Sequence, residues 1–228
     1  MKKAFTMLEL VFVIVIIGIL AVVAMPSFQR DTLQEAGNQI ISHIRYTQHL
    51  AMMDNKFDPA DATWFKTRWQ IDFRDPNANN VYYTIYQDLD KSGGPSTNIH
   101  KGEIAKNPNN PKQMLTALAT GASATSKNSP QMQLNKKFGI SSITFSPSCS
   151  YRNSQKLSFD YMGRPLYGNP SSLGYTSGGT PINNPYLDNG GHTGARLIKT
   201  QCKITFSTGS DSMIIAIEPE TGYAHILN

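Results

Sequence analysis

One acidic residue stands inside the most apolar stretch of the chain. Glu9 lies in the run of residues 5–25, where Thr6 is the only other polar residue. An ionisable side chain placed in hydrocarbon costs about 2.5–3.5 kcal/mol on insertion scales, so such a residue is a functional candidate by default. A positive charge beside the Glu9 carboxylate would offset this cost. Glu9 is therefore the first candidate functional residue of the sequence.

A second group of acidic residues has the spacing of a metal-binding loop. In the stretch DLDKSGG, Asp88, Asp90 and Ser92 stand at alternate positions and Gly93 follows at the bend, which is typical of the start of a calcium loop. The acid that closes such a loop is missing, because Ile99 stands where Glu is expected. The stretch predicts either a calcium site or a polar hairpin turn, and no other cofactor is indicated.

Four cations in the second half of the chain, Arg152, Arg164, Arg196 and Lys199, would form a basic patch if the fold gathers them. Such a patch would bind DNA through phosphate contacts, and the binding would weaken with salt. A solvated loop face is the alternative. The net charge of +5 is spread thinly along the chain, so charge alone does not indicate nucleic acid.

The sequence gives little support to an enzyme. It contains no Gly-x-Ser-x-Gly, no His-Glu-x-x-His and no phosphate-binding Gly-Lys-Ser/Thr loop. His43 and His49 are six residues apart, which does not place them on one helical face as a ligand pair. We therefore expect a protein that is not an enzyme.

Two helical segments must position Glu9. The apolar run 5–25 would span roughly 31 Å as a helix, which matches a hydrocarbon core of about 30 Å. A signal peptide and a plain membrane anchor compete as interpretations, but neither explains Glu9. Residues 26–56 are amphipathic at helical spacing and predict a continuation of the helix, bent at Pro26 or broken there into two helices.

The rest of the chain, 57–228, reads as a β-rich head. The turn RDPNANN between two alternating segments predicts a hairpin. Two stretches, 116–129 and 168–194, have the composition of loops. The predicted strands are residues 68–73, 81–86, 140–146, 156–163, 202–207, 213–218 and 223–227.

The N-terminal stretch KKAFTMLEL resembles the leader of type IV pilins and type II secretion pseudopilins. The resemblance implies a leader of residues 1–4, cleavage between Ala4 and Phe5, and N-methylation of Phe5. It also implies that Glu9 is the assembly acid and that Pro26 is the proline that kinks the helix. Ala4 departs from the glycine usual at the cleavage site. The implied fold is α+β and pilin-like, with a long N-terminal helix, half of it transmembrane, packed on an antiparallel sheet.

Lys2 and Lys3 before the apolar run place the N-terminus in the cytoplasm and the head in the periplasm of a bacterium. That compartment is oxidising, so we expect a disulfide between Cys149 and Cys202. Two independent buried thiols are the alternative.

The order of elements, with LSFDYMGRP and a terminal hairpin ending in PETGYAHIL, resembles most the minor H-type pseudopilins. The resemblance implies a minor filament subunit of a type II secretion system or a type IV pilus. The implied partners are other pilins or pseudopilins, a prepilin peptidase, an inner-membrane assembly platform and the membrane itself. A competence-type minor pilin whose head binds DNA for uptake is the alternative.

Overall fold

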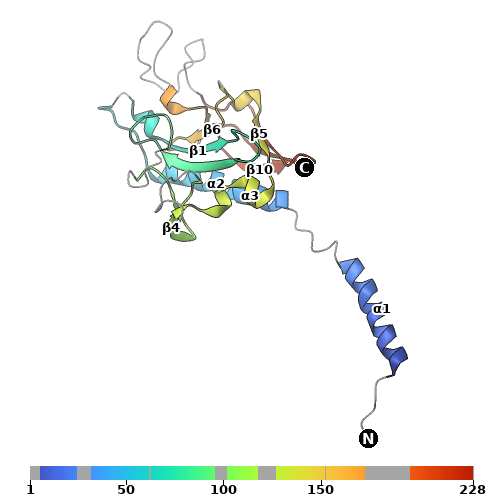
Figure 1. Ribbon diagram of the computed structural model, residues 1–228. Helices are drawn as coiled ribbons and strands as arrows, with labels where there is room; N and C mark the ends of the chain where they lie inside the picture. The colour runs from blue at the N-terminus through green and yellow to red at the C-terminus, as the bar shows by residue number, and fades with distance from the viewer. Residues whose placement is uncertain are drawn as a thin grey trace. The chain divides into compact units, whose positions relative to one another are not determined.

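A computed structural model describes residues 6–24, 32–61, 63–95, 102–117, 127–151, 153–172 and 196–227 (Figure 1). The chain divides into two compact units, Met1–Thr32 and Leu33–Asn228.

The first unit holds one helix, α1, Met7–Ala24. Its start is explained locally, because the Thr6 hydroxyl accepts a hydrogen bond from the Glu9 backbone N–H (3.3 Å), as an N-cap residue does. Phe5 and Met25, the two ends of the predicted apolar segment 5–25, lie outside the described residues. Pro26 lies outside them as well. Across the part of the chain that the structure describes, no helix is both long enough and apolar enough to cross a membrane.

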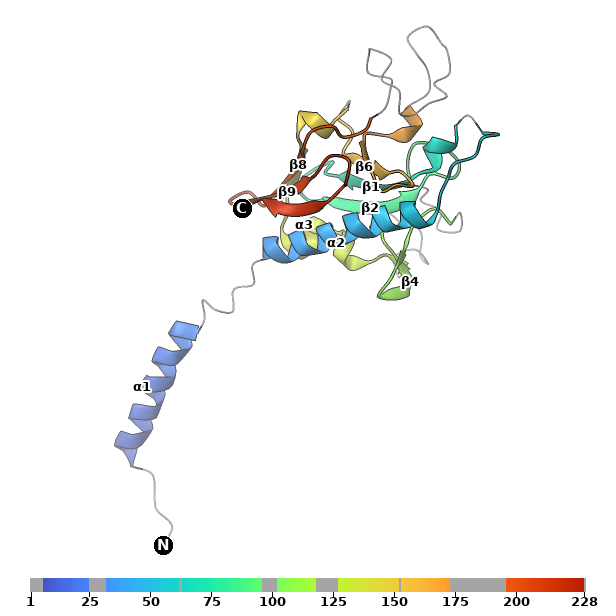
Figure 2. The same ribbon diagram turned by 180° about the vertical axis from the view of Figure 1, so that it is seen from behind.

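The second unit begins with α2, Thr32–Met53. Its buried residues recur at helical spacing and form one face, Ala36, Gly37, Ile40, Ile41, Ile44, Thr47 and Ala51. The helix approaches the sheet closely at Gly37, where an added Cβ would overlap Met213 Sδ and lie 2.9 Å from Ile226 Cδ1. The absence of a side chain at Gly37 therefore lets α2 pack directly on the C-terminal strands (Figure 2).

The described strands form two four-stranded antiparallel sheets and one small hairpin. The first sheet has the order β2-β1-β6-β7, and its strands are Tyr82–Gln87, Trp69–Arg74, Lys156–Phe159 and Pro165–Tyr167. The second has the order β10-β9-β8-β5, and its strands are Ala224–Leu227, Ser212–Ile217, Cys202–Ser207 and Ser142–Phe145. The small hairpin pairs β3 (Lys106–Asn107) with β4 (Asn110–Met114).

Phe73 on β1 joins the two sheets in one core. Its ring stacks on Tyr83 of β2 (5.4 Å between centroids) and meets Phe145 of β5 (5.9 Å) and Phe206 of β8 (5.7 Å). Phe73, Tyr83 and Phe206 are fully buried. The buried face of α2 belongs to the same cluster of core residues, so the helix and both sheets share one interior.

The α+β class with antiparallel strands is confirmed, and so is the hairpin of β1 and β2. The prediction of a single sheet is wrong, because β1 pairs with β6 whereas β5 pairs with β8. The sequence also missed β3, β4, β7 and the short helix α3, Leu134–Phe138, which ends at Gly139 in the left-handed conformation (φ 72°). Four 3₁₀ turns complete the described elements, Trp64–Thr67, Pro130–Met132, Pro147–Cys149 and Pro170–Ser172.

Candidate functional site

From Met7 to Leu20 the side chains of α1 are apolar apart from Glu9. The described side chains of this helix are exposed, and its large apolar residues from Met7 to Leu20 have exposed fractions between 44% and 87%. Glu9 in the first turn is the one charged residue of α1. A carboxylate there is favoured by the partial positive charge of the helix N-terminus. Ala4 and Phe5, the predicted cleavage pair, lie outside the described residues.

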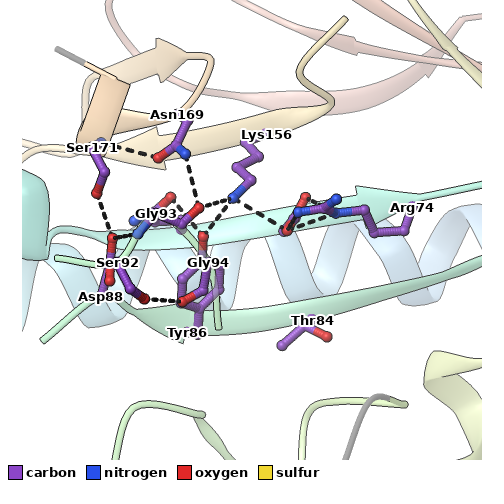
Figure 3. Close-up of polar contacts among 12 residues, drawn as sticks. Arg74, Thr84, Tyr86, Asp88, Ser92, Gly93, Gly94, Lys156, Asn169 and Ser171 are labelled. Atoms are coloured by element: carbon purple, nitrogen blue, oxygen red, sulfur yellow. Dashed lines mark hydrogen bonds and ion pairs between the residues drawn. The ribbon is translucent and has the colours of Figure 1, made fainter. Parts of the chain in front are cut away.

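A buried polar network lies in the head where β1, β2 and β6 run side by side (Figure 3). Lys156 on β6 is only 4% exposed. Its ammonium donates to Gly93 O (2.7 Å) and Tyr86 Oη (2.9 Å) and lies 3.4 Å from Asp72 Oδ2. Asp72 also accepts from Arg74 Nε (3.0 Å to each carboxylate oxygen). Two cations therefore share one buried carboxylate.

The pKa values in this network follow from burial. Burial lowers the pKa of the Lys156 ammonium below its ordinary value, although the Asp72 carboxylate opposes this shift. Burial raises the pKa of Tyr86 well above its ordinary value, and the negative charges of Asp72 and Asp88 add to the shift. Tyr86 is therefore a neutral hydrogen-bond partner, and its hydroxyl donates to Gln70 Oε1 (3.1 Å).

The network extends from β2 to the turn Pro170–Ser172. Asp88 directly follows β2, is fully buried, and accepts through Oδ2 from Gly93 N (2.8 Å) and from the Ser171 hydroxyl. Asn169 Nδ2 donates to Gly93 O (2.8 Å), the same oxygen that Lys156 contacts. The loop after β2 is thus fastened on one side to β6 and on the other to the 3₁₀ turn (Figure 3).

A pocket of about 340 Å³ opens beside this network. Asp72, Arg74, Lys156 and Asn169 are among its lining residues. Its cations already have carboxylate partners, because Lys156 and Arg74 both contact Asp72. We therefore assign no anionic ligand to this pocket.

The predicted calcium residues are brought together in part. One carboxylate oxygen each of Asp88, Asp90 and Glu103 lies within 4.8 Å of the others. The Ser92 hydroxyl instead donates to Gly94 O (3.4 Å). The sequence missed Glu103, whose backbone oxygen accepts from Gln87 N at the end of β2 (2.9 Å). The signal was an acidic residue just before the apolar pair Ile104 and Ala105.

The residues of the predicted basic patch differ in their surroundings. Arg196 is only 3% exposed and donates to Asn169 O (3.0 Å), which leaves its guanidinium little surface for a phosphate contact. Arg164 pairs with the buried carboxylate of Asp160 (2.8 Å). Lys199 is exposed, and Arg152 lies outside the described residues.

The predicted disulfide is confirmed. Cys149 and Cys202 are bonded, with their Cα atoms 5.4 Å apart, and both residues are fully buried. The bond fastens the 3₁₀ turn Pro147–Cys149 to the first residue of β8.

Comparisons of this chain with protein-family models, with curated proteins and with solved structures found no match.

Proposed function

We propose that this chain is a minor pilin-like subunit, a pseudopilin, of a type II secretion or type IV pilus filament. In this proposal a prepilin peptidase cleaves between Ala4 and Phe5 and the new N-terminus is methylated. The subunit is held in the bacterial inner membrane by its N-terminal segment, with the head in the periplasm, until an assembly platform moves it into the filament. It performs no catalysis.

The observation that carries the proposal is the surface of α1. Apart from Glu9, its described side chains are apolar and exposed around the helix. A helix that is apolar all round needs an apolar environment on every side, which lipid or neighbouring helices supply. An amphipathic helix lying on a head of its own would instead show one apolar stripe, as α2 does.

The role proposed for Glu9 follows from the cost of burying a charge. After cleavage, the α-ammonium of Phe5 on one subunit would face Glu9 of its neighbour. Each charge removes the other's burial cost, and an incomplete pair is strongly unfavourable. The pair therefore fixes the axial register of neighbouring subunits and selects processed chains for assembly.

Other partners are proposed to be pilins or pseudopilins of the same filament, and the head supplies the contacts to them. DNA binding is not part of the proposal, because Arg196 is buried and Arg164 is paired with Asp160.

The first test is the mass of the chain recovered from the membranes of cells that produce it. We expect a chain that begins at methylated Phe5. An intact Met1 or a start at Met25 would each contradict the proposal, because neither leaves an α-ammonium four residues before Glu9.

The second test separates the charge of Glu9 from its size. Glu9→Gln is expected to be processed normally but to fall at least ~10-fold in sheared filaments, since an unpaired buried charge costs several kcal/mol. Val15→Leu on the same helix is the control and should assemble as the unmodified chain does. Normal filament incorporation of Glu9→Gln would show that the carboxylate does not set the register.

A further inference from the structure

Three carboxylates converge just beyond β2. Asp88 and Glu103 are buried, with exposed fractions of 0% and 1%, whereas Asp90 is exposed. The backbone holds the two sides of the loop together, because Gln87 N donates to Glu103 O (2.9 Å) and Asp90 N donates to Glu103 Oε1 (3.3 Å). An oxygen from each of the three carboxylates is within 4.8 Å of the other two.

A second observation points to a cation here. Asp88 is fully buried, and its Oδ2 accepts the hydrogen bonds from Gly93 N and the Ser171 hydroxyl. Its other oxygen, Oδ1, is buried as well and has no hydrogen-bond partner. A buried carboxylate oxygen without a partner is costly, because it has lost its hydration and gained nothing in exchange. A bound cation would supply the missing interaction.

We propose that Asp88, Asp90 and Glu103 bind one calcium ion. Oxygen-only ligands select a hard cation rather than zinc or copper. Three carboxylates from the protein suit Ca²⁺, which takes about six to eight oxygen ligands in a flexible arrangement, better than Mg²⁺, which keeps several waters and is usually bound through one or two carboxylates. The three carboxylate oxygens lie within 4.8 Å of one another, close enough for one ion to contact them all. Waters complete the shell on the exposed side, at Asp90.

The ion would stabilise more than its own loop. Asp88 is bonded to Ser171, and Gly93 is bonded to Asn169 and to Lys156. Calcium would therefore fasten the end of β2 to the turn Pro170–Ser172 and, through Lys156, to Asp72 on β1. The proposal does not depend on the proposed filament function.

The test is thermal unfolding and titration calorimetry of the full chain in detergent, after chelation and removal of metal. We expect 1 mM Ca²⁺ to raise the Tm by roughly 5 °C, as a ligand well above its Kd does, and 1 mM Mg²⁺ to raise it much less. Calorimetry should give one site per chain. Absence of a Ca²⁺-dependent shift, or an equal shift with Mg²⁺, would overturn the proposal.

Matched variants locate the site. Asp90→Asn, at an exposed position that leaves the fold intact, should weaken Ca²⁺ binding at least ~10-fold, since it removes one charged ligand. Glu103→Gln, which keeps the size of the side chain, should remove the Tm shift. Glu220→Gln on the exposed turn after β9 is the control and should bind as the unmodified chain does. Equal Ca²⁺ affinity in Asp90→Asn and Glu220→Gln would contradict the assignment.

Discussion

At the scale of single residues, a short chain of hydrogen bonds couples α2 to β2. Gln39 Nε2 donates to Tyr83 Oη (2.8 Å), which lies 2.6 Å from His43 Nδ1. Because the Tyr83 oxygen already accepts from Gln39, its proton is free to be donated to a neutral His43. Burial lowers the pKa of His43 from 6.5 to about 4 and raises the pKa of Tyr83 above its ordinary value.

His43 should therefore make the stability of the head depend on pH. Between pH 6.5 and pH 4 the unfolded chain binds a proton at His43 that the folded chain does not, so this part of the unfolding free energy is present above pH 6.5 and is lost as the pH falls toward 4. A pKa shift of this size corresponds to roughly 3 kcal/mol of unfolding free energy. Urea unfolding of the full chain in detergent at pH 7.5, 5.5 and 4.0 measures the loss.

The matched variants are His43→Gln and His49→Gln, the latter at an exposed position of the same helix. His43→Gln should remove the part of the pH dependence that lies near pH 5.5, whereas His49→Gln should retain it. Equal slopes in the two variants would show that His43 is not the group responsible.

The candidate metal cluster shows what residue spacing reveals and what it misses. The sequence predicts Asp88 and Asp90 as ligands because they stand two residues apart in the loop-like stretch DLDKSGG. The structure places their carboxylates together. Glu103 comes from 13 residues beyond Asp90, on the other side of a hairpin loop, so its contribution depends on how β2 pairs with the chain that returns. Ser92 is the third ligand position in the regular spacing of a calcium loop. In this protein the Ser92 hydroxyl donates to Gly94 O instead.

At the scale of elements, the turn between β6 and β7 depends on one glycine. Asp160 accepts through Oδ1 from Met162 N (2.9 Å) and Arg164 N (2.8 Å), which closes the turn. Gly163 adopts a positive φ of 81°, and a Cβ there would lie 3.0 Å from Met52 Sδ and 3.1 Å from Gln48 Nε2. The turn is thus both left-handed and packed against the end of α2.

Gly163→Ala should lower the unfolding free energy by roughly 2 kcal/mol, about half from the left-handed backbone and half from crowding. The control is Gly139→Ala, because Gly139 also has a positive φ of 72° but has open space around it. The control should cost only about 1 kcal/mol. The denaturant midpoints of the two variants, at an unchanged m-value, measure both losses of unfolding free energy. Equal losses in Gly163→Ala and Gly139→Ala would show that α2 does not constrain the turn.

Elements with a strong local signal were predicted well, and those without one were missed. The alternating pattern of CKITFS matches β8 residue for residue, and the amphipathic helix predicted over 26–56 contains α2, which is several residues shorter. The strands β3, β4 and β7 contain Asn, Pro and Lys, residues that are poor strand formers, so their composition does not indicate strands. Each is held by a local hairpin, β3 with β4 and β7 with β6.

At the scale of the whole molecule, the Cys149–Cys202 disulfide closes a loop across 53 residues of sequence. The variant with both Cys149→Ala and Cys202→Ala should lose about 4 kcal/mol of unfolding free energy, since the bond restricts the unfolded chain. Each single Cys→Ala variant should lose about as much as the double variant, because one bond is removed in every case. Chemical unfolding under non-reducing conditions measures this, and a loss below ~1 kcal/mol in the double variant would be contrary to expectation.

The sequence predicted the class of the head but not its division into two sheets. Composition and strand pattern are enough for an antiparallel α+β fold. Which strands pair is decided by contacts between distant segments, such as those that Phe73 makes with Phe145 and Phe206. The chain crosses from β5 in one sheet to β6 in the other through the segment that holds Cys149, and no local signal marks that crossing.

The uniform surface of α1 has a consequence for recognition. The described side chains of α1, apart from Glu9, are apolar in every direction. A partner therefore meets the same kind of surface whichever way the helix is rotated about its axis. Exclusion of water is non-directional, so on such a surface only the shapes of the side chains can favour one rotation over another. Glu9 is the single charge on this helix. Any discrimination between partners that depends on charge is therefore limited, on α1, to this one carboxylate.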